Sequence, residues 1–217
     1  MRYWFFDLDG TLADTDRDIR GAWKAALADL GLTCPDFEEK FVAGPPIDEM
    51  VKTLFPRGFT QCLADGIRAG FARHYDSDGF PNTREYPGVM DAVRDLKARG
   101  DYAAIVTNKR FAGAAAMARR FRWDEVFDGV YAGDMYAETI GRLPKGALLA
   151  RLIGELGAPK AECTMVGDTI SDFRAAEENG IRSVGVAWGY GKPVELARAT
   201  KVVHAASEIP ALADGVR

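Results

Sequence analysis

Two aspartates stand one residue apart, directly after an apolar run near the start of the chain. The run Tyr3–Phe6 is typical of a buried strand, and Asp7 and Asp9 follow it, together with Gly10 and Thr11. A carboxylate at the end of a strand can act as a nucleophile, and a second one beside it can give and take protons. Glycine lets the backbone approach a ligand closely. The spacing therefore predicts a reaction site at the end of this strand.

Further polar residues follow other apolar runs. Thr107 and Asn108 end one run, Asp168 ends another with Asp172 four residues later, and Lys145 opens a helical stretch. In parallel α/β sheets, ligands bind beyond the carboxyl ends of the strands. We therefore expect these side chains to meet at the edge to which Asp7 and Asp9 belong.

Carboxylates gathered in a small volume repel one another and stay ionised together only beside a cation. Oxygen-only ligands with open positions suit Mg²⁺. With Mg²⁺ bound, Asp7 could attack a phosphorus atom, and Asp9 could protonate the leaving oxygen and later take a proton from water. Gly10 would let the backbone approach the phosphoryl group, and Thr107 and Lys145 would hold its oxygens and neutralise its charge.

Two further residues carry separate arguments. Lys145 stands at the start of its helix, where the helix dipole disfavours a cation, and an anionic substrate would explain its presence. Asp172 fits two roles equally well, an acid in the first turn of its helix or a group behind the metal ligands.

The bulk composition limits the classes of function. The chain has 217 residues, of which 47% are hydrophobic and 28% charged, and its net charge is −4. This balance provides no basic surface for nucleic acid or for a membrane. Three separated cysteines favour a reducing compartment, and the N-terminal residues do not fit a signal peptide, so we expect a cytoplasmic protein of unknown oligomeric state.

Apolar runs alternate with helical patterns, which predicts an α/β fold with a doubly wound, Rossmann-like parallel sheet. The expected strands are Arg2–Asp7, Tyr102–Thr107, Val126–Ala132, Cys163–Gly167, Ser183–Ala187 and Lys201–His204. The expected helices between them are Val89–Arg99, Phe111–Phe121, Pro144–Leu156 and Ser171–Asn179.

Residues 15–86 contain no convincing strand and predict an inserted all-helical cap domain, so that residues 1–14 and 87–217 form the core. The expected cap helices are Ile19–Leu30, Phe37–Val42, Ile47–Phe55 and Thr60–Tyr75. The loop Gly44–Ile47 is the expected substrate-facing segment, with Lys52 and Arg57 as candidate contacts for an anion.

The complete set of motifs resembles the haloacid dehalogenase superfamily, in its phosphoglycolate-phosphatase-like branch. The matching stretches are DLDGT at 7–11, IVTN ending at Asn108, Lys145, and GDTISD at 167–172, with GPPIDEM, YPGV and GVAWGYG as support for the branch. The resemblance implies that Asp7 and Asp168 bind Mg²⁺ by their side chains and Asp9 by its carbonyl. We also expect Gly10, Thr11 and Asn108 to contact the phosphate.

Two departures from the family pattern stand out. The order here is Pro144-Lys145-Gly146 where many relatives have lysine before proline, which leaves the placement of the lysine open. The arginine that sugar-phosphate mutases of the superfamily usually have in the cap is absent from Gly44-Pro45-Pro46.

We therefore expect a Mg²⁺-dependent phosphatase that hydrolyses a small phosphorylated metabolite, phosphoglycolate-like or a nucleoside monophosphate, through an aspartyl-phosphate. The alternatives are a phosphomutase for a sugar phosphate, a metal-independent dehalogenase, which Asp9 argues against, and a non-catalytic regulatory domain.

Overall fold

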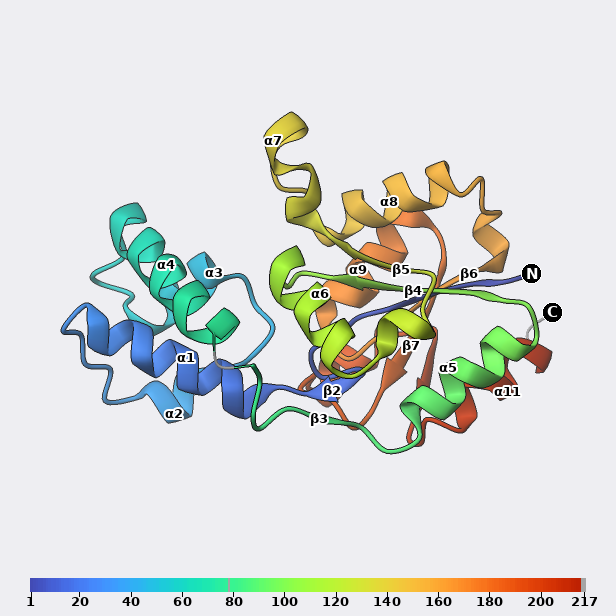
Figure 1. The fold of residues 1–217 in the computed structure, drawn as a ribbon, viewed down its shortest axis with the longest axis horizontal. Coiled ribbons are helices and arrows are strands. Elements are labelled where there is room, and N and C mark those ends of the chain that lie inside the picture. The colour runs from blue at the N-terminus through green and yellow to red at the C-terminus, as the bar shows by residue number, and fades with distance from the viewer. Residues whose placement is uncertain (78, 216–217) are drawn as a thin grey trace. The chain divides into compact units, whose positions relative to one another are not determined.

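The computed structural model describes residues 1–77 and 79–215 (Figure 1). The chain divides into two compact units, one of Met1–Asp14 with Arg84–Arg217 and one of Thr15–Thr83. Residue 78, which the sequence analysis assigned to the cap, and residues 216–217, which it assigned to the core, lie outside the described residues.

The first unit is built around a six-stranded sheet in which every neighbouring pair of strands is parallel. The strand order is β5-β4-β1-β6-β7-β8. These strands are β1 (Tyr3–Phe6), β4 (Tyr102–Thr107), β5 (Gly129–Ala132), β6 (Cys163–Gly167), β7 (Arg182–Val186) and β8 (Lys201–Val203). The predicted Rossmann-like α/β fold is therefore confirmed, and β1, which ends at Asp7, lies in the middle of the sheet between β4 and β6.

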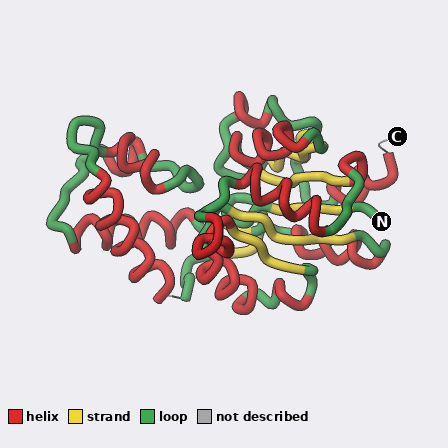
Figure 2. Tube along the Cα trace, turned by 90° about the horizontal axis from the view of Figure 1, so that it is seen from above, coloured by secondary structure: helices red, strands yellow, loops and turns green. Residues whose placement is uncertain are grey.

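Helices cover both faces of this sheet (Figure 2). The helices of the first unit are α5 (Val89–Ala98), α6 (Phe111–Arg120), α7 (Ala137–Ile140), α8 (Lys145–Glu155), α9 (Ile170–Asn179), α10 (Pro193–Leu196) and α11 (Glu208–Gly215). Tyr3 and Phe5 pack with Leu148 and Leu149 of α8 and with Ala176 of α9. Helices α5 and α11 lie together on the other side of the sheet (Figure 1). Because both faces are covered, the central strands are continuously apolar, as the sequence showed.

One predicted strand boundary is wrong. The segment from Val126 was expected to start a strand, but β5 begins at Gly129 and a 3₁₀ turn occupies Trp123–Glu125. The backbone N–H groups of Val126 and Phe127 donate to the carbonyl of Trp123 instead of to a neighbouring strand. Their apolar side chains are explained by packing, since the Phe127 ring meets that of Phe6 edge-on at 5.7 Å.

The two connections between the units pair with each other within the first unit. Strand β2 (Ala13–Asp14) is antiparallel to β3 (Arg84–Glu85), and the backbone of Tyr86 donates to the carbonyl of Leu12. Residues 84–86 therefore belong to the core, whereas the sequence analysis assigned them to the cap. A two-residue strand has too few apolar positions to be recognised from its pattern.

The second unit is all-helical in its described residues. Its helices are α1 (Asp16–Asp29), α2 (Phe37–Lys40), α3 (Ile47–Leu54) and α4 (Gln61–Ser77). Helices α1 and α4 pack closely at Gly70, where a Cβ atom would lie 2.9 Å from that of Ala26. Trp23 of α1 is buried against the rings of Phe41 and Phe71.

Asp18 joins the two chain ends of this helical unit. Its carboxylate accepts hydrogen bonds from the backbone N–H groups of Asn82 and Thr83, from the Asn82 amide and from the Thr83 hydroxyl. These bonds hold the pKa of Asp18 below its ordinary value, against the opposing effect of partial burial. The ionised form of Asp18 therefore stabilises the closure of the unit.

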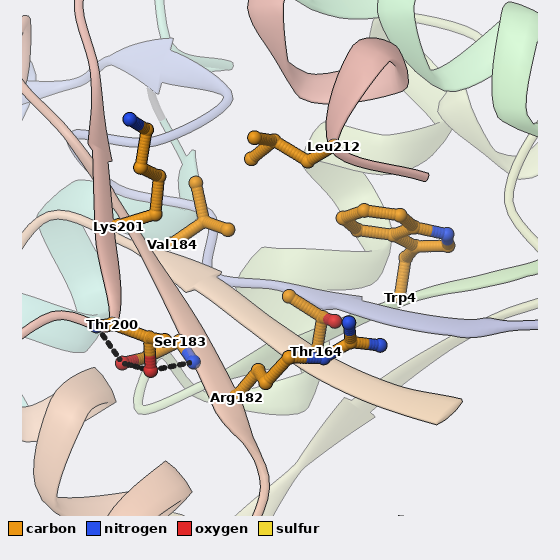
Figure 3. A pocket seen from close by; sticks show the side chains of 8 residues that line it. All are labelled: Trp4, Thr164, Arg182, Ser183, Val184, Thr200, Lys201 and Leu212. Carbon is orange, nitrogen blue, oxygen red and sulfur yellow. Dashed lines mark hydrogen bonds between the residues drawn. The ribbon is translucent and has the colours of Figure 1, made fainter. Parts of the chain in front are cut away.

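A cavity of about 40 Å³ lies between the sheet and α11 (Figure 3). It is lined mainly by residues near the beginnings of the strands, including Trp4, Thr164 and Ser183, and by Leu212. The acids of interest follow the other ends of the strands, so this cavity is a packing void and not part of the reaction site. Among the described residues, no helix is both long and apolar enough to cross a membrane.

Candidate active site

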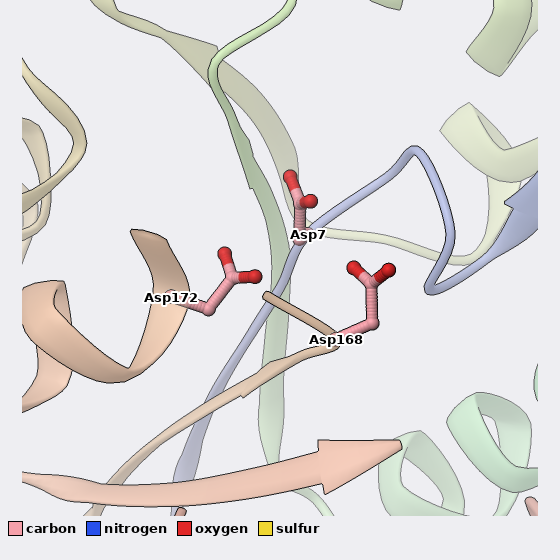
Figure 4. Close-up of side chains that lie close together, drawn as sticks. All are labelled: Asp7, Asp168 and Asp172. Carbon is pink, nitrogen blue, oxygen red and sulfur yellow. The ribbon is translucent and has the colours of Figure 1, made fainter. Parts of the chain in front are cut away.

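Three buried carboxylates converge at the carboxyl ends of β1 and β6 (Figure 4). Asp7 follows β1, Asp168 follows β6 and Asp172 lies in the first turn of α9. One carboxylate oxygen from each lies within 4.8 Å of the others, and the three residues are at most 7% exposed. The crossover from β6 to α9 is short, which brings the last two acids beside the first.

Lys145 supplies the positive charge of this cluster. It is the first residue of α8 and only 4% exposed, and its Nζ lies 2.6 Å from Oδ1 of Asp172 and 2.8 Å from Oδ1 of Asp7. Burial alone would lower the pKa of Lys145, but the two carboxylates outweigh it, and the pKa lies above its ordinary value. A lysine at a helix N-terminus is thus stabilised by two acids of the protein itself.

Asp7 has the free acceptor capacity that a nucleophile needs. Although Lys145 forms an ion pair with its Oδ1, this buried oxygen accepts no well-directed hydrogen bond from any described residue. Burial raises the pKa of Asp7 to about 6; Lys145 opposes this shift and the charge of Asp172 adds to it. The ionised form of Asp7 is therefore under-solvated and would gain from a further cation.

Asp168 is fixed by the segment that follows β7. Its Oδ2 accepts a hydrogen bond of 2.7 Å from the backbone N–H of Tyr190, and its Oδ1 accepts one of 3.3 Å from the hydroxyl of Thr11. A Cβ atom at Gly191 would lie 1.7 Å from the carbonyl oxygen of Asp168, so only glycine fits there. Burial, followed by the charges of Asp172 and Asp7, raises the pKa of Asp168 well above its ordinary value.

Asp172 has two roles at once. Its Oδ2 accepts hydrogen bonds of 3.0 Å from the backbone N–H and from the hydroxyl of Thr169, the N-cap of α9, while its Oδ1 binds Lys145. The sequence left helix capping and a place behind the metal ligands open. In the structure the residue caps the helix, and its other oxygen orients the lysine that pairs with Asp7.

Asp9 does not join the cluster of acids. Both of its carboxylate oxygens bind Nζ of Lys109, at 2.8 and 3.0 Å. The sequence analysis expected Asp9 among the acids gathered at this edge, and in an extended chain Asp7 and Asp9 would share a face. However, β1 ends at Phe6 and the chain turns, with the N–H groups of Thr11 and Leu12 donating to the carbonyl of Leu8, so the two carboxylates separate. Asp9 instead faces the segment that follows β4.

The remaining predicted site residues lie around this centre. Gly10 has a φ of 81°, and a Cβ there would lie 2.2 Å from Oδ2 of Asp168. The hydroxyl of Thr107, which is 2% exposed, accepts a hydrogen bond from the backbone N–H of Lys109. The Asn108 amide donates to Ser171 at 2.8 Å. Thr11 contacts Asp168, and so supports an acid in this structure.

Sequence reasoning gave no role to Lys109, Ser171, Arg142 or Tyr190. Arg142 donates from its guanidinium to the backbone carbonyl of Asn108. The only signal for Lys109 was its position directly after Asn108, and Ser171 lies inside the GDTISD stretch without a role of its own. Tyr190 binds Asp168 through its backbone N–H, which any residue except proline provides.

The donor set fits a magnesium ion. Three carboxylates and one ammonium leave two uncompensated negative charges in a buried volume. All available ligand atoms are oxygens, which Mg²⁺ prefers. Because Asp172 is already satisfied by Lys145 and Thr169, Asp7 and Asp168 are the side chains with acceptor capacity for a cation.

A parallel α/β sheet with buried acids and a buried lysine beyond the carboxyl ends of its strands is suited to an enzyme that acts on an anionic substrate. A family model described as haloacid dehalogenase-like hydrolase matches residues 4–186. The chain belongs to this family of hydrolases, and it resembles the phosphoglycolate phosphatases within it.

Individual relatives cover nearly the whole chain. The chain is 30% identical to a 5′-nucleotidase of Pseudomonas aeruginosa, over 95% of this chain and 91% of that protein. It is 28% identical to a phosphoglycolate phosphatase of Aquifex aeolicus, over 88% and 87%. A predicted phosphatase from Clostridium acetobutylicum has the same fold, with a TM-score of 0.87, 24% identity and 99% coverage of both chains.

Proposed function

We propose that this protein is a Mg²⁺-dependent phosphatase that hydrolyses a small phosphorylated metabolite through an aspartyl-phosphate at Asp7. The observation on which this rests is the buried Asp7 carboxylate, with an oxygen that lacks a well-directed hydrogen bond among the described residues and an ammonium group 2.8 Å away. Phosphoglycolate-like esters and nucleoside monophosphates are the proposed substrate classes, since similar proteins bear names for both activities.

The first half of the reaction follows from the groups around Asp7. A carboxylate oxygen of Asp7 attacks phosphorus while the bond from phosphorus to the leaving oxygen breaks, and Asp9 gives that oxygen a proton. Lys145, held by Asp172, offsets part of the charge beside the nucleophile. Thr107 and Asn108, at the end of β4, are the proposed contacts for the phosphoryl oxygens, together with the backbone at Gly10.

In the second half, Asp9 takes a proton from water, which attacks phosphorus and releases Asp7. Mg²⁺, held by Asp7 and Asp168 and by the carbonyl of Asp9, would neutralise the charge of the phosphoryl group. The narrow space at Gly10 and Gly191 keeps Asp168 in place throughout.

Substrate choice is proposed to lie in the helical cap, in the loop Gly44–Ile47 and at two cations. Lys52 lies 5.0 Å from the centre of the Phe59 ring, and Arg57 is exposed. Substitution of either cation by methionine should raise KM for an anionic metabolite more than for p-nitrophenyl phosphate.

The test is the release of phosphate from a panel of metabolite phosphates and p-nitrophenyl phosphate, with Mg²⁺ or with EDTA. We expect Mg²⁺-dependent hydrolysis that Asp7→Asn abolishes, with the variant still folded by circular dichroism. No hydrolysis of any ester by the wild type would overturn the proposal.

The same panel separates the alternatives. Conversion of one sugar phosphate isomer into another, faster than phosphate release, would identify a phosphomutase. Activity on a haloacid that survives EDTA would identify a dehalogenase. The cap loop Gly44-Pro45-Pro46 contains no arginine, and Asp9 is present, so we expect neither result.

A further inference from the structure

A buried lysine outside the chemistry described above holds both carboxylate oxygens of Asp9. Nζ of Lys109 lies 2.8 Å from Oδ1 and 3.0 Å from Oδ2, and the two side chains are 7% and 15% exposed. Because both oxygens bind the same ammonium, this pair sets the direction of the carboxylate as well as its position. Charge-assisted hydrogen bonds are also the stronger ones, and burial limits their exchange with water.

The backbone from which Lys109 projects is itself restrained. Its N–H donates to the hydroxyl of Thr107 at 3.1 Å, directly after β4. The neighbouring residue Asn108 is bound on both sides, by Arg142 at its carbonyl and by Ser171 at its amide. The lysine therefore reaches Asp9 from a fixed turn, and Asp9 is oriented by β4 and not by its own strand.

The two buried lysines of the site contact different acids. Lys145 binds Asp7 and Asp172, whereas Lys109 binds Asp9, 100 residues away in sequence. The charge of the nucleophile is thus compensated without Lys109. A defect caused by the loss of Lys109 should accordingly fall on the steps in which Asp9 takes part.

We propose that Lys109 is a positioning residue for Asp9, an inference that rests on the proposed phosphatase function. In the first step a bond forms between an Asp7 oxygen and phosphorus. Before the step one oxygen of Asp9 carries a proton; the bond from phosphorus to the leaving oxygen breaks, its electron pair stays on that oxygen, and the proton moves there, which leaves Asp9 as the carboxylate that Lys109 binds. Lys109 takes no part in these bonds. It fixes the direction from which Asp9 delivers the proton.

The dependence of the rate on the leaving group reports this role. An alkoxide is a poor leaving group and needs the proton, whereas p-nitrophenolate leaves without one. The variant Lys109→Met keeps most of the side-chain length and removes the charge. We compare kcat/KM, which reports only the steps up to departure of the leaving group and not the later hydrolysis of the phosphoenzyme. We expect kcat/KM on an alkyl phosphate to fall by about 10-fold or more, and kcat/KM on p-nitrophenyl phosphate by less than about 3-fold, since general acids contribute about 100-fold to 10,000-fold.

Three controls separate a positioning role of Lys109 from a general effect on folding. Lys97 forms a lysine–carboxylate pair with Asp128 in the same unit, at a more exposed position and away from the acids of the site, and Lys97→Met should leave the leaving-group preference unchanged. In the background of Asp9→Asn, Lys109→Met should have no further effect on that preference, because the acid it orients is gone. Lys109→Arg keeps the positive charge, so its ratio of rates on the two substrates should lie between those of the wild type and Lys109→Met.

Each outcome decides between roles. Equal losses of kcat/KM on both substrates would overturn the inference and indicate a structural or phosphate-binding lysine. Faster hydrolysis of the alkyl phosphate by Lys109→Met would also overturn it, because the ion pair would then hold Asp9 in an orientation that hinders proton transfer. A wild-type protein that hydrolyses neither substrate would instead refute the phosphatase function itself.

Discussion

The substitution Lys145→Met tests the charge balance of the site most severely. It removes the ammonium between Asp7 and Asp172 while preserving most of the side-chain volume, and both acids are almost completely buried. Removing one partner of a buried ion pair costs about 3–5 kcal/mol. The loss of stability cannot exceed the free energy of protonating one of the freed carboxylates. At pH 7 that free energy is about 4 kcal/mol for a carboxyl group of ordinary pKa.

With this upper limit the loss is about 3–4 kcal/mol, which for a chain of this length corresponds to a fall in Tm of roughly 6–16 °C. The loss should shrink as the pH is lowered from 7 towards 5, because the freed carboxylates then take up protons more readily. The double variant Lys145→Met with Asp172→Asn should recover most of the stability, since an amide oxygen can still accept from Thr169 at the start of α9. It should not recover activity, because Asp7 still lacks its cation.

The assay is thermal and urea unfolding of the wild type, both variants and Lys97→Met, all in EDTA at pH 5, 6 and 7. Lys97 and Asp128 are about a third exposed, so that control should lose much less stability. A loss below about 1 kcal/mol for Lys145→Met would refute the reasoning, because that is the range of surface pairs. A double variant no more stable than the single one would also refute it.

Three further results are expected. Without metal, the free energy of unfolding should fall by about 3 kcal/mol as the pH rises from about 4 to 6. Asp7 has a pKa of about 6 in the folded protein against 3.8 in the unfolded chain, so the folded state holds the extra proton over this range. Mg²⁺ should reverse this fall and Asp7→Asn should abolish it, whereas a flat profile in EDTA would contradict the prediction. Gly191→Ala should weaken Mg²⁺ binding and lower Tm, because its Cβ would overlap the carbonyl of Asp168, and unchanged calorimetric titration would contradict this. Asp18→Asn should destabilise the protein above pH 4 and lose its effect as the pH falls below that value, since the pKa of Asp18 is lowered on folding. Urea unfolding of the variant and the wild type at pH 3 and pH 6 measures this difference.

The sheet was predictable because its strands are buried on both faces. The runs that became β1, β4 and β6 are almost continuously apolar, whereas β7 also contains Arg182 and Ser183. The apolar pattern gave a wrong strand boundary where a residue is buried but its backbone does not pair with a neighbouring strand. Phe127 is buried against Phe6, yet its N–H closes a 3₁₀ turn, so an apolar run alone extended β5 too far.

Short elements were missed for a related reason. Helices α7 and α10 have four residues each, and β2 and β3 have two, which is too short for a periodic pattern. Their ends are fixed by tertiary contacts, such as the pairing of Ala13 with Glu85 across more than 70 residues of sequence.

The sequence indicated which residues gather at the site, but not which side chains contact each other there. The motifs indicated that Asp7, Asp168 and Lys145 meet, since all three follow or precede elements at one sheet edge. They could not show that Asp9 faces Lys109, because that contact depends on the conformation of the turn after β4. The two roles of Asp172 likewise became visible only from the separate partners of its two oxygens.

The most direct test of the proposed mechanism is to trap the covalent intermediate on Asp7. The wild type would be mixed with Mg²⁺ and a phosphate ester that it hydrolyses, and the reaction would be quenched in acid within the first turnover. The protein would then be reduced with borohydride and digested. Mass spectrometry should find the peptide that contains Asp7 with one phosphoryl group before reduction and with homoserine at that position after it. Phosphate release at the normal rate with Asp7 unmodified at every quench time, or a label on another residue, would contradict the account.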